Sequence, residues 1–303
     1  MTNATQVLST VNNIKSLMNG FTVEVTPKGA QKISDFQAHL SPGTKVYVTA
    51  LPDSDFADTV ATCKKLSDHG MQPIPHVTAR SIKSLTELEE RIKLVTQEAG
   101  VTQVLAIAGA DKAAAGPFED SAAMLETGLF DRYGIKSIGI AGHPEGSPDI
   151  ASPLLREYGK RKIDYAQLTD SQLYLVTQFV FQAEPIIQWV ERIRRENNQL
   201  PLVIGIPGIA SLKALIGHAR ACGIGPSMTV LTKQAKNLHK LLTLQEPNEL
   251  IRQLADYKAS HPESLIAGLH IFPLGGLLPS AKWAYRVADG HIELHKQSFN
   301  TLY

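Results

Sequence analysis

Short apolar runs alternate with segments of helical character along the whole 303-residue chain. Most of the runs are almost continuously apolar, which is typical of strands covered on both faces, as in a parallel sheet. The runs are residues 21–26, 45–51, 73–78, 102–109, 136–142, 172–181, 201–208 and 266–274. Strands that alternate with helices in this way predict an α/β fold.

The segments between the runs have the spacing of helices. In 83–99, apolar residues recur at steps of three and four from Leu85 to Val95, which forms an apolar stripe on one face. Ser81 is the expected N-cap of this helix. Further helices are expected at 29–40, 55–68, 119–132, 151–163, 184–197, 209–221 and 247–260.

Two architectures fit this alternation: a (β/α)8 TIM barrel, and an open doubly wound sheet with an extra subdomain. A nucleotide-binding sheet of the second kind carries a GxGxxG turn after an early strand, and the first run lacks one. No linker rich in Pro, Gly or Ser divides the chain. We therefore predict a single (β/α)8 TIM barrel with extra helices over residues 19–303, as the catalytic domain. An N-terminal extension, residues 1–18, would plug the barrel bottom as a helix or contact a partner.

Composition excludes several classes of protein. With 43% hydrophobic residues, and 30 Lys and Arg against 29 Asp and Glu, neither disorder nor a general attraction to nucleic acid or membrane is expected. No apolar stretch has the length of a membrane helix, and the N-terminus lacks a secretion signal. Two cysteines make no disulfide scaffold and form no zinc motif, so a cytoplasmic protein without a metal is expected. No HExxH or GxSxG motif supports metal or serine hydrolysis.

Two polar residues interrupt the apolar runs. Glu24 lies between Val23 and Val25, and a carboxyl group that faces an apolar interior favours its protonated form, which suits a general acid. The alternative is a solvated or ion-paired glutamate. Gln178 lies in a long apolar run, where its amide needs partners from a bound heterocycle or from a neighbouring strand.

Further candidates lie at the ends of the runs, where barrels hold their chemistry. His76 ends the third run, although such a histidine is more often a core or rim residue. Thr49, at the end of the second run, more often just finishes a strand. Asp111 follows the fourth run and would accept from a ligand or cap the next helix, and capping is the favoured interpretation.

Two other segments carry charge beside the expected strand ends. Residues 142–146, Gly-His-Pro-Glu-Gly, place His143 and Glu145 on one rim loop. The Lys-Arg-Lys run at 160–162 would meet a phosphate, although such a run is more typical of a solvated helix face.

Taken in order, these segments resemble the methylenetetrahydrofolate reductase family. V-E-V-T-P at 23–27 is similar to the family's F-E-F-F-P strand, P-H-V-T at 75–78 to its P-H-L-T, and V-T-Q-F at 176–179 to its I-T-Q-F. I-A-G-H-P-E-G-S-P at 140–148 is similar to its A-G-Y-P-E-G-H-P. The resemblance extends in unbroken order over about residues 20–280.

The resemblance implies a (β/α)8 barrel that binds FAD and interconverts 5,10-methylenetetrahydrofolate and 5-methyltetrahydrofolate, with NADH or NADPH as the electron partner. It implies Glu24 as the general acid, and homo-oligomers, which family members often form. The substrate-binding positions that it implies, for tetrahydrofolate derivatives, are Gln178, Asp111 and His218. Those for the flavin are Thr49, His76, Ala108, Gly109, His143, Glu145, Ser147 and Lys162.

Several positions depart from the family pattern. The arginine of its L-R-G-D turn is Ala108 here, and the aspartate is displaced by one position to Asp111. The Asn-Arg pair of its last strand is Gly275-Gly276. Alternatives therefore stay open: direct reduction by NAD(P)H without flavin, a folate-binding barrel subunit without catalysis, and an enzyme for another pterin or one-carbon compound.

Overall fold

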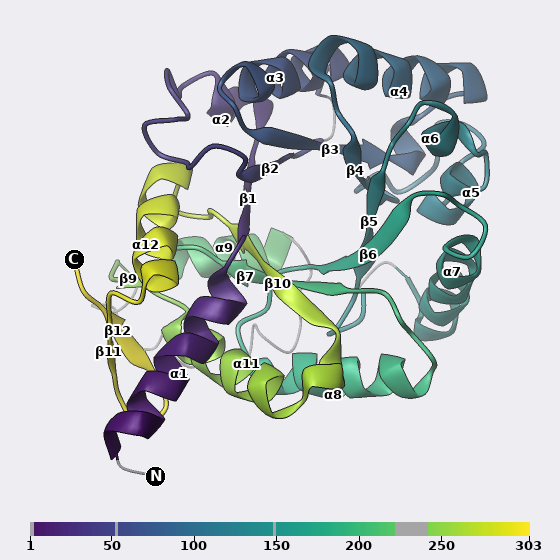
Figure 1. The fold of residues 1–303 in the computed structure, drawn as a ribbon. Coiled ribbons are helices and arrows are strands. Elements are labelled where there is room, and N and C mark those ends of the chain that lie inside the picture. The colour runs from purple at the N-terminus through teal and green to yellow at the C-terminus, as the bar shows by residue number, and fades with distance from the viewer. Residues whose placement is uncertain (1–2, 52–53, 148–149, 222–241) are drawn as a thin grey trace. The chain divides into compact units, whose positions relative to one another are not determined.

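A computed structural model describes residues 3–51, 54–147, 150–221 and 242–303, and it contains a closed eight-stranded barrel with interleaved helices (Figure 1). The strand order is β1-β10-β7-β6-β5-β4-β3-β2, and the pairs β2–β3, β3–β4, β4–β5, β7–β10 and β1–β10 are parallel. The strands are β1 (Thr22–Val25), β2 (Lys45–Val48), β3 (Gln72–Thr78), β4 (Gln103–Ile107), β5 (Ser137–Gly142), β6 (Gln172–Thr177), β7 (Leu202–Pro207) and β10 (Ile266–Phe272). The predicted (β/α)8 barrel is confirmed, and every strand overlaps its predicted run.

The chain divides into two compact units, each made of several segments. Unit 1 comprises residues 1–23, 143–151 and 177–303, and unit 2 comprises residues 24–142 and 152–176.

Unit 2 holds the strands from β2 to β5 and the helices that follow them. Its helices are α2 (Pro27–Ala30), α3 (Phe56–Asp68), a 3₁₀ turn (Ala79–Ser81), α4 (Leu85–Ala99), α5 (Ser121–Leu125), α6 (Leu129–Arg132) and α7 (Ser152–Tyr165). Of the predicted stripe of α4, Leu88, Ile92 and Val95 are buried, whereas Leu85 at the start of the helix is exposed. Its N-cap is wrong in the prediction, because Ser84 instead of Ser81 accepts the N–H of Glu87, at 3.1 Å.

Two predicted helices of unit 2 are shorter than expected. The helix expected at 29–40 ends at Ala30, and the Lys65 ammonium donates to the carbonyls of Ala30 and Ile33 at 3.0 and 2.6 Å. A side chain from α3 thus satisfies the carbonyls at the helix end. The helix expected at 119–132 splits at Gly128, whose φ of 70° is left-handed.

Unit 1 holds the remaining helices and two small antiparallel sheets. Its elements besides barrel strands are α1 (Asn3–Met18), α8 (Ala183–Arg195), β8 (Ala210–Ser211), α9 (Leu212–Ala221), β9 (Leu244–Gln245), α11 (Asn248–Ser260), a 3₁₀ turn (Pro262–Ser264), α12 (Leu277–Asp289), β11 (Ile292–Leu294) and β12 (Phe299–Thr301). The segment expected as an extension is the helix α1, which packs against α11 and α12 (Figure 1). Ile14, Leu17 and Met18 in the second half of this helix are fully buried.

The first and last barrel strands meet within unit 1. The hydroxyl of Thr22 on β1 lies 2.8 Å from Nδ1 of His270 on β10, and the two residues are also direct partners in the strand register. His270 is 1% exposed. A polar contact inside the core thus pins the register of the pair that closes the barrel.

Across the described ranges, no helix is both long and apolar enough to span a bilayer. The same residues contain no group of three His, Cys, Asp or Glu side chains placed to hold a metal ion. Cys63 is buried, and Cys222 lies outside the described residues.

Candidate functional site

The residues predicted for the site are divided between the two units. Unit 2 contains Glu24, Thr49, His76, Ala108, Gly109, Asp111 and Lys162, whereas unit 1 contains His143, Glu145, Ser147, Gln178 and His218.

The ends of β1 and β2 lie side by side in unit 2. Glu24 is half-buried on β1 between the buried Val23 and Val25. Thr49 is buried just after β2, and its N–H donates to the carbonyl of Val25 at 3.0 Å. The structure therefore places Thr49 against the strand that carries Glu24.

A cleft of about 460 Å³ opens in unit 2 beside the C-terminal ends of β2, β3 and β4. Two predicted residues, His76 and Asp111, line it, together with Thr78, which ends β3. The other lining residues are Ala50, Leu51, Ser54, Asp55, Phe56, Thr59, Arg80, Ser81, Lys83, Arg91, Ala110, Ala113 and Ala115. The volume is in the range of small-molecule sites, and this end of a barrel is where ligands bind.

The turn after β4 adjoins this cleft and requires a glycine. Gly109 has a φ of 97°, and a Cβ there would lie 3.2 Å from Cβ of Thr78. The carbonyl of Ala108 accepts the N–H of Arg80 at 2.9 Å. The favoured role of Asp111 as a helix cap is wrong, because Asp120 caps α5 and accepts the N–H groups of Ala122 and Ala123 at 2.6 and 3.0 Å.

Arg80 fastens this turn with its side chain. Its Nε donates to the carbonyl of Glu119 at 3.0 Å and its Nη1 to the carbonyl of Asp111 at 3.1 Å. The backbone carbonyl of Arg80 accepts the N–H of Ala115 at 2.8 Å. The loop after β4 is thus tied to the end of β3 at several points.

A second arginine of the cleft, Arg91, is neutralised by its neighbour. Its Nη2 lies 2.6 Å from Oε1 of Glu87, one helical turn away on α4. Partial burial would raise the pKa of Glu87, but the N–H of Lys83 and the guanidinium of Arg91 outweigh it, so this pKa is lowered. The Arg91 guanidinium also lies 5.0 Å from the ring centroid of Phe56.

Lys162 differs from the solvated helix face that its charge run predicts. It is 8% exposed, and burial lowers the pKa of its ammonium to about 8, with Asp120 opposing and Arg161 adding to the shift. Arg161, by contrast, pairs with Asp120 at 3.1 Å and with Glu126 at 2.7 Å. Burial thus disfavours the protonated form of Lys162, whereas the charge of its neighbour Arg161 is balanced by two carboxylates.

In unit 1, His143, Glu145 and Ser147 are half-buried on the loop after β5. The N–H of Gly146 donates to the carbonyl of His143 at 3.2 Å, which closes a turn in this loop. Gln178 is exposed just after β6, and its Oε1 accepts the N–H of Phe179 at 3.0 Å. The backbone of the next residue thus supplies the partner of the amide oxygen, which the sequence alone did not identify.

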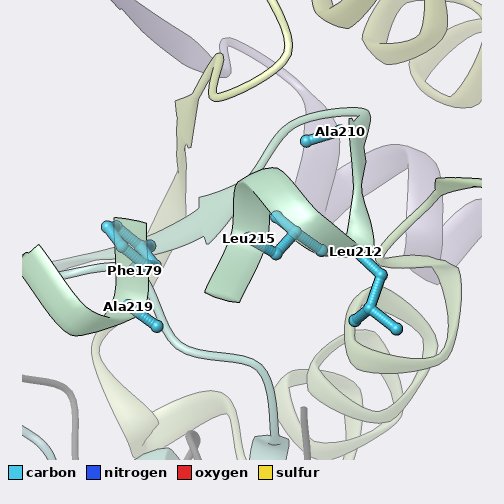
Figure 2. Packing of buried hydrophobic residues seen from close by; sticks show 5 residues of the cluster. All are labelled: Phe179, Ala210, Leu212, Leu215 and Ala219. Atoms are coloured by element: carbon cyan, nitrogen blue, oxygen red, sulfur yellow. The ribbon is translucent and has the colours of Figure 1, made fainter. Parts of the chain in front are cut away.

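The orientation of α9 is fixed by an apolar cluster that also holds Phe179 (Figure 2). Leu212, Leu215 and Ala219 lie on its buried face at helical spacing, and His218 is exposed. Phe179 in turn lies against Phe272, with 5.1 Å between ring centroids. The residue after Gln178 is therefore anchored in the same cluster as the helix that carries His218.

The sequence prediction missed Arg80, Lys83, Arg91 and Phe56 among the cleft residues. A signal for Arg80 was present, because it follows the P-H-V-T run by two residues, at the strand end where a barrel places its ligand contacts. Arg91 and Phe56 are brought to the cleft by α4 and the start of α3, and only the packing of these helices reveals it.

Comparisons with known proteins agree with this architecture. A family model described as methylenetetrahydrofolate reductase matches residues 20–233. Methylenetetrahydrofolate reductase 1 of Schizosaccharomyces pombe is 31% identical over 88 residues, which are 29% of this chain and only 14% of that protein. An uncharacterized protein from Clostridium thermocellum, which binds two copies of 5-methyl-5,6,7,8-tetrahydrofolic acid, has a similar structure. Its TM-score is 0.53 at 12% identity, over 90% of this chain and 96% of that one, a likeness that shows the fold alone.

Proposed function

The chain belongs to the methylenetetrahydrofolate reductase family, and from this premise we propose that it interconverts 5,10-methylenetetrahydrofolate and 5-methyltetrahydrofolate by hydride transfer through a bound flavin. The observation that carries the proposal is the cleft of about 460 Å³ at the strand ends of unit 2, lined by the predicted residues His76 and Asp111. The folate bound by the Clostridium thermocellum protein of similar fold supports the substrate class.

The donors present suit a flavin nucleotide. Lys162 is a buried cation with a pKa lowered to about 8, and a bound phosphate would favour its protonated form. Within unit 2, the residues that would hold the FAD are Thr49, His76, Ala108, Gly109 and Lys162. The resemblance to the family also implies flavin contacts for His143, Glu145 and Ser147. When bound, the flavin would supply a two-electron carrier between NADH or NADPH and the folate.

Glu24 would act as the general acid. It is half-buried on β1 between the buried Val23 and Val25. Donation of a proton from its carboxyl group to N10 of the methylene-folate would open the imidazolidine ring to a 5-iminium cation. The carboxylate left behind would stabilise this cation.

Gln178, Asp111 and His218 would bind the substrate. The exposed amide of Gln178 would hydrogen-bond the pterin. The N–H of Phe179 holds this amide in place, and Phe179 itself packs against Phe272. His218 would reach the folate from the exposed face of α9. Asp111 would do so from the cleft.

A second candidate function is direct hydride transfer from NAD(P)H to the folate without flavin. It is favoured by Ala108, which stands where the family has an arginine that contacts the cofactor. In this version the cleft and Lys162 would bind the nicotinamide dinucleotide.

An absorbance spectrum of the purified protein separates the two candidates. We expect a flavin band, either as purified or after addition of FAD, that bleaches when 5-methyltetrahydrofolate is added without oxygen. A colourless protein that oxidises NADH in the presence of methylene-folate would instead establish the flavin-free reaction. Folate binding with no turnover in either direction would reject both candidates and indicate a folate-binding subunit without catalysis.

We also propose that residues 19–303 form the catalytic domain and that the reaction takes place in the cytoplasm. The low cysteine content supports a reducing compartment.

A further inference from the structure

Arg80 is held rigidly at the rim of the cleft in unit 2. Its Nε and Nη1 donate to the carbonyls of Glu119 and Asp111, and its own backbone N–H donates to Ala108. These bonds fix the guanidinium and use only part of its donors. Nη2 of Arg80 donates no hydrogen bond to any of the described residues.

The charge of Arg80 is not neutralised by the groups that fix it, because both are uncharged carbonyls. No carboxylate of the described residues forms an ion pair with it. Arg91 on the same cleft differs, since Glu87 lies 2.6 Å from its guanidinium. A fixed guanidinium that has no ion pair and lies beside a cavity is suited to bind an anion.

The rest of the lining indicates what the anion is attached to. Leu51, Phe56 and Ala110 give the cleft apolar wall, Lys83 adds a second, exposed cation, and Asp55 and Asp111 add two carboxyl groups. A cavity of about 460 Å³ with apolar walls and cations has room for a nucleoside beside its phosphates. His76 and Thr78, at the end of β3, line the same cleft, so the occupant also reaches the rim of the barrel.

We propose that Arg80 binds the diphosphate of a dinucleotide coenzyme, and so replaces the arginine that the family carries at the position of Ala108. The two positions adjoin, because the N–H of Arg80 bonds the carbonyl of Ala108 at 2.9 Å. The proposal rests on the proposed function, and either FAD or NAD(P)H supplies the required nucleoside diphosphate. Arg80, which follows β3, would then supply the positive charge that Ala108, in the turn after β4, no longer provides.

The first experiment uses the unaltered protein and titration calorimetry with ADP and adenosine. ADP should bind at least about tenfold more tightly than adenosine, since a charged hydrogen bond contributes about 1.5 kcal/mol or more. Added salt should reduce the affinity for ADP and leave that for adenosine unchanged. Equal affinities for the two, or no binding of ADP at millimolar concentration, would overturn the proposal.

The second experiment changes the cation. Arg80→Gln should weaken ADP about tenfold or more, and the matched variant Arg91→Gln should weaken it less, because Glu87 already neutralises Arg91. Adding Ala108→Arg to the Arg80→Gln protein should restore most of the affinity for ADP. If Arg80→Gln loosens the fold, Arg80→Lys keeps the charge and should keep the preference for ADP over adenosine.

The outcomes separate this proposal from the function it rests on. FAD that binds more tightly than riboflavin, with the difference reduced in Arg80→Gln, supports both. ADP and NADH that bind through Arg80, in a protein that takes up no flavin, support the proposal and reject the flavin. FAD that binds the folded Arg80→Gln variant as tightly as the unaltered protein would reject the role of Arg80 and leave the flavin intact.

Discussion

The hydroxyl of Tyr47 on β2 lies 2.8 Å from the hydroxyl of Tyr174 on β6, although 127 residues separate the two along the chain. Burial raises the pKa of both groups, that of Tyr174 to about 12, so the pair stays uncharged. Tyr174 also lies against Gly139 on β5, where a Cβ would be 3.0 Å from the Tyr174 hydroxyl. A neutral polar contact therefore fixes two strands of unit 2 at the level where β5 has no side chain.

Tyr174→Phe should lower the free energy of unfolding by about 1–2 kcal/mol, because the buried hydrogen bond between the Tyr47 and Tyr174 hydroxyls is lost. Urea denaturation measures this change. Tyr158→Phe on α7, a partly exposed position, is the matched control and should change stability by less than about 0.5 kcal/mol. Equal effects of the two variants would show that the hydroxyl pair contributes no net stability.

Lys162→Met should stabilise the fold at pH 7 by up to about 3 kcal/mol, because it removes a buried cation whose pKa is lowered from 10.5 to about 8. Between pH 8 and 10.5 the unfolded chain binds more protons at Lys162 than the folded chain does. The stability of the unaltered protein should therefore rise with pH through this window, and the advantage of the variant should shrink.

The exposed neighbour gives the control for this experiment. Lys160→Met should leave both the stability and its pH dependence nearly unchanged, since the Lys160 ammonium is 81% exposed. A parallel loss of affinity for FAD in Lys162→Met alone would support the proposed contact with a phosphate. A stability gain that persists unchanged at pH 10.5 would contradict the assigned cause.

Glu24→Gln should slow folate reduction by about two to four orders of magnitude. It should nearly spare the reduction of the flavin by NADH, because only the folate half-reaction needs a proton donor. Stopped-flow measurement of the two half-reactions checks this. Gln178→Ala is the comparison, and it should chiefly weaken folate binding. Equal losses in both half-reactions of Glu24→Gln would make Glu24 a residue that positions the cofactor.

Gly275→Asn, which restores a family residue, should destabilise the protein by about 1–3 kcal/mol or more. A Cβ at this position would collide with the carbonyl oxygen of Ile209 and would lie 2.9 Å from Cα of Ala210. Thermal unfolding measures the effect. Gly217→Ala on α9 is the control, because a Cβ there meets nothing within 4 Å, and it should be neutral or stabilising.

The barrel was predictable from sequence because buried parallel strands are apolar throughout, and this pattern does not depend on distant partners. The first helix after β1 was not, because its end is set by Lys65, whose ammonium satisfies the carbonyl of Ala30 from another helix. The N-cap of α4 was misplaced by three residues, because the sequence does not distinguish Ser81 from Ser84. Only the backbone does so, since Ser81 ends a 3₁₀ turn and Ser84 is extended.

The candidate site was predictable where strand ends carry polar groups, as for His76, which lines the cleft. The burial of Lys162 was not, because a run of three cations does not reveal which one faces inward. Nor was the cleft as a whole, since it also depends on Phe56 and Arg91 from the following helices. The roles of Glu24 and Gln178 stay predictions that the kinetic experiments decide.

The contact between Thr22 and His270 joins residues 248 positions apart. A ribosome that makes the chain must therefore extrude β1 long before its partner β10 exists, and the open edge of β1 stays exposed in the meantime. Such distant pairing slows folding and favours aggregation of partly made chains. Production of this protein in a foreign host should consequently improve with slower translation or added chaperones.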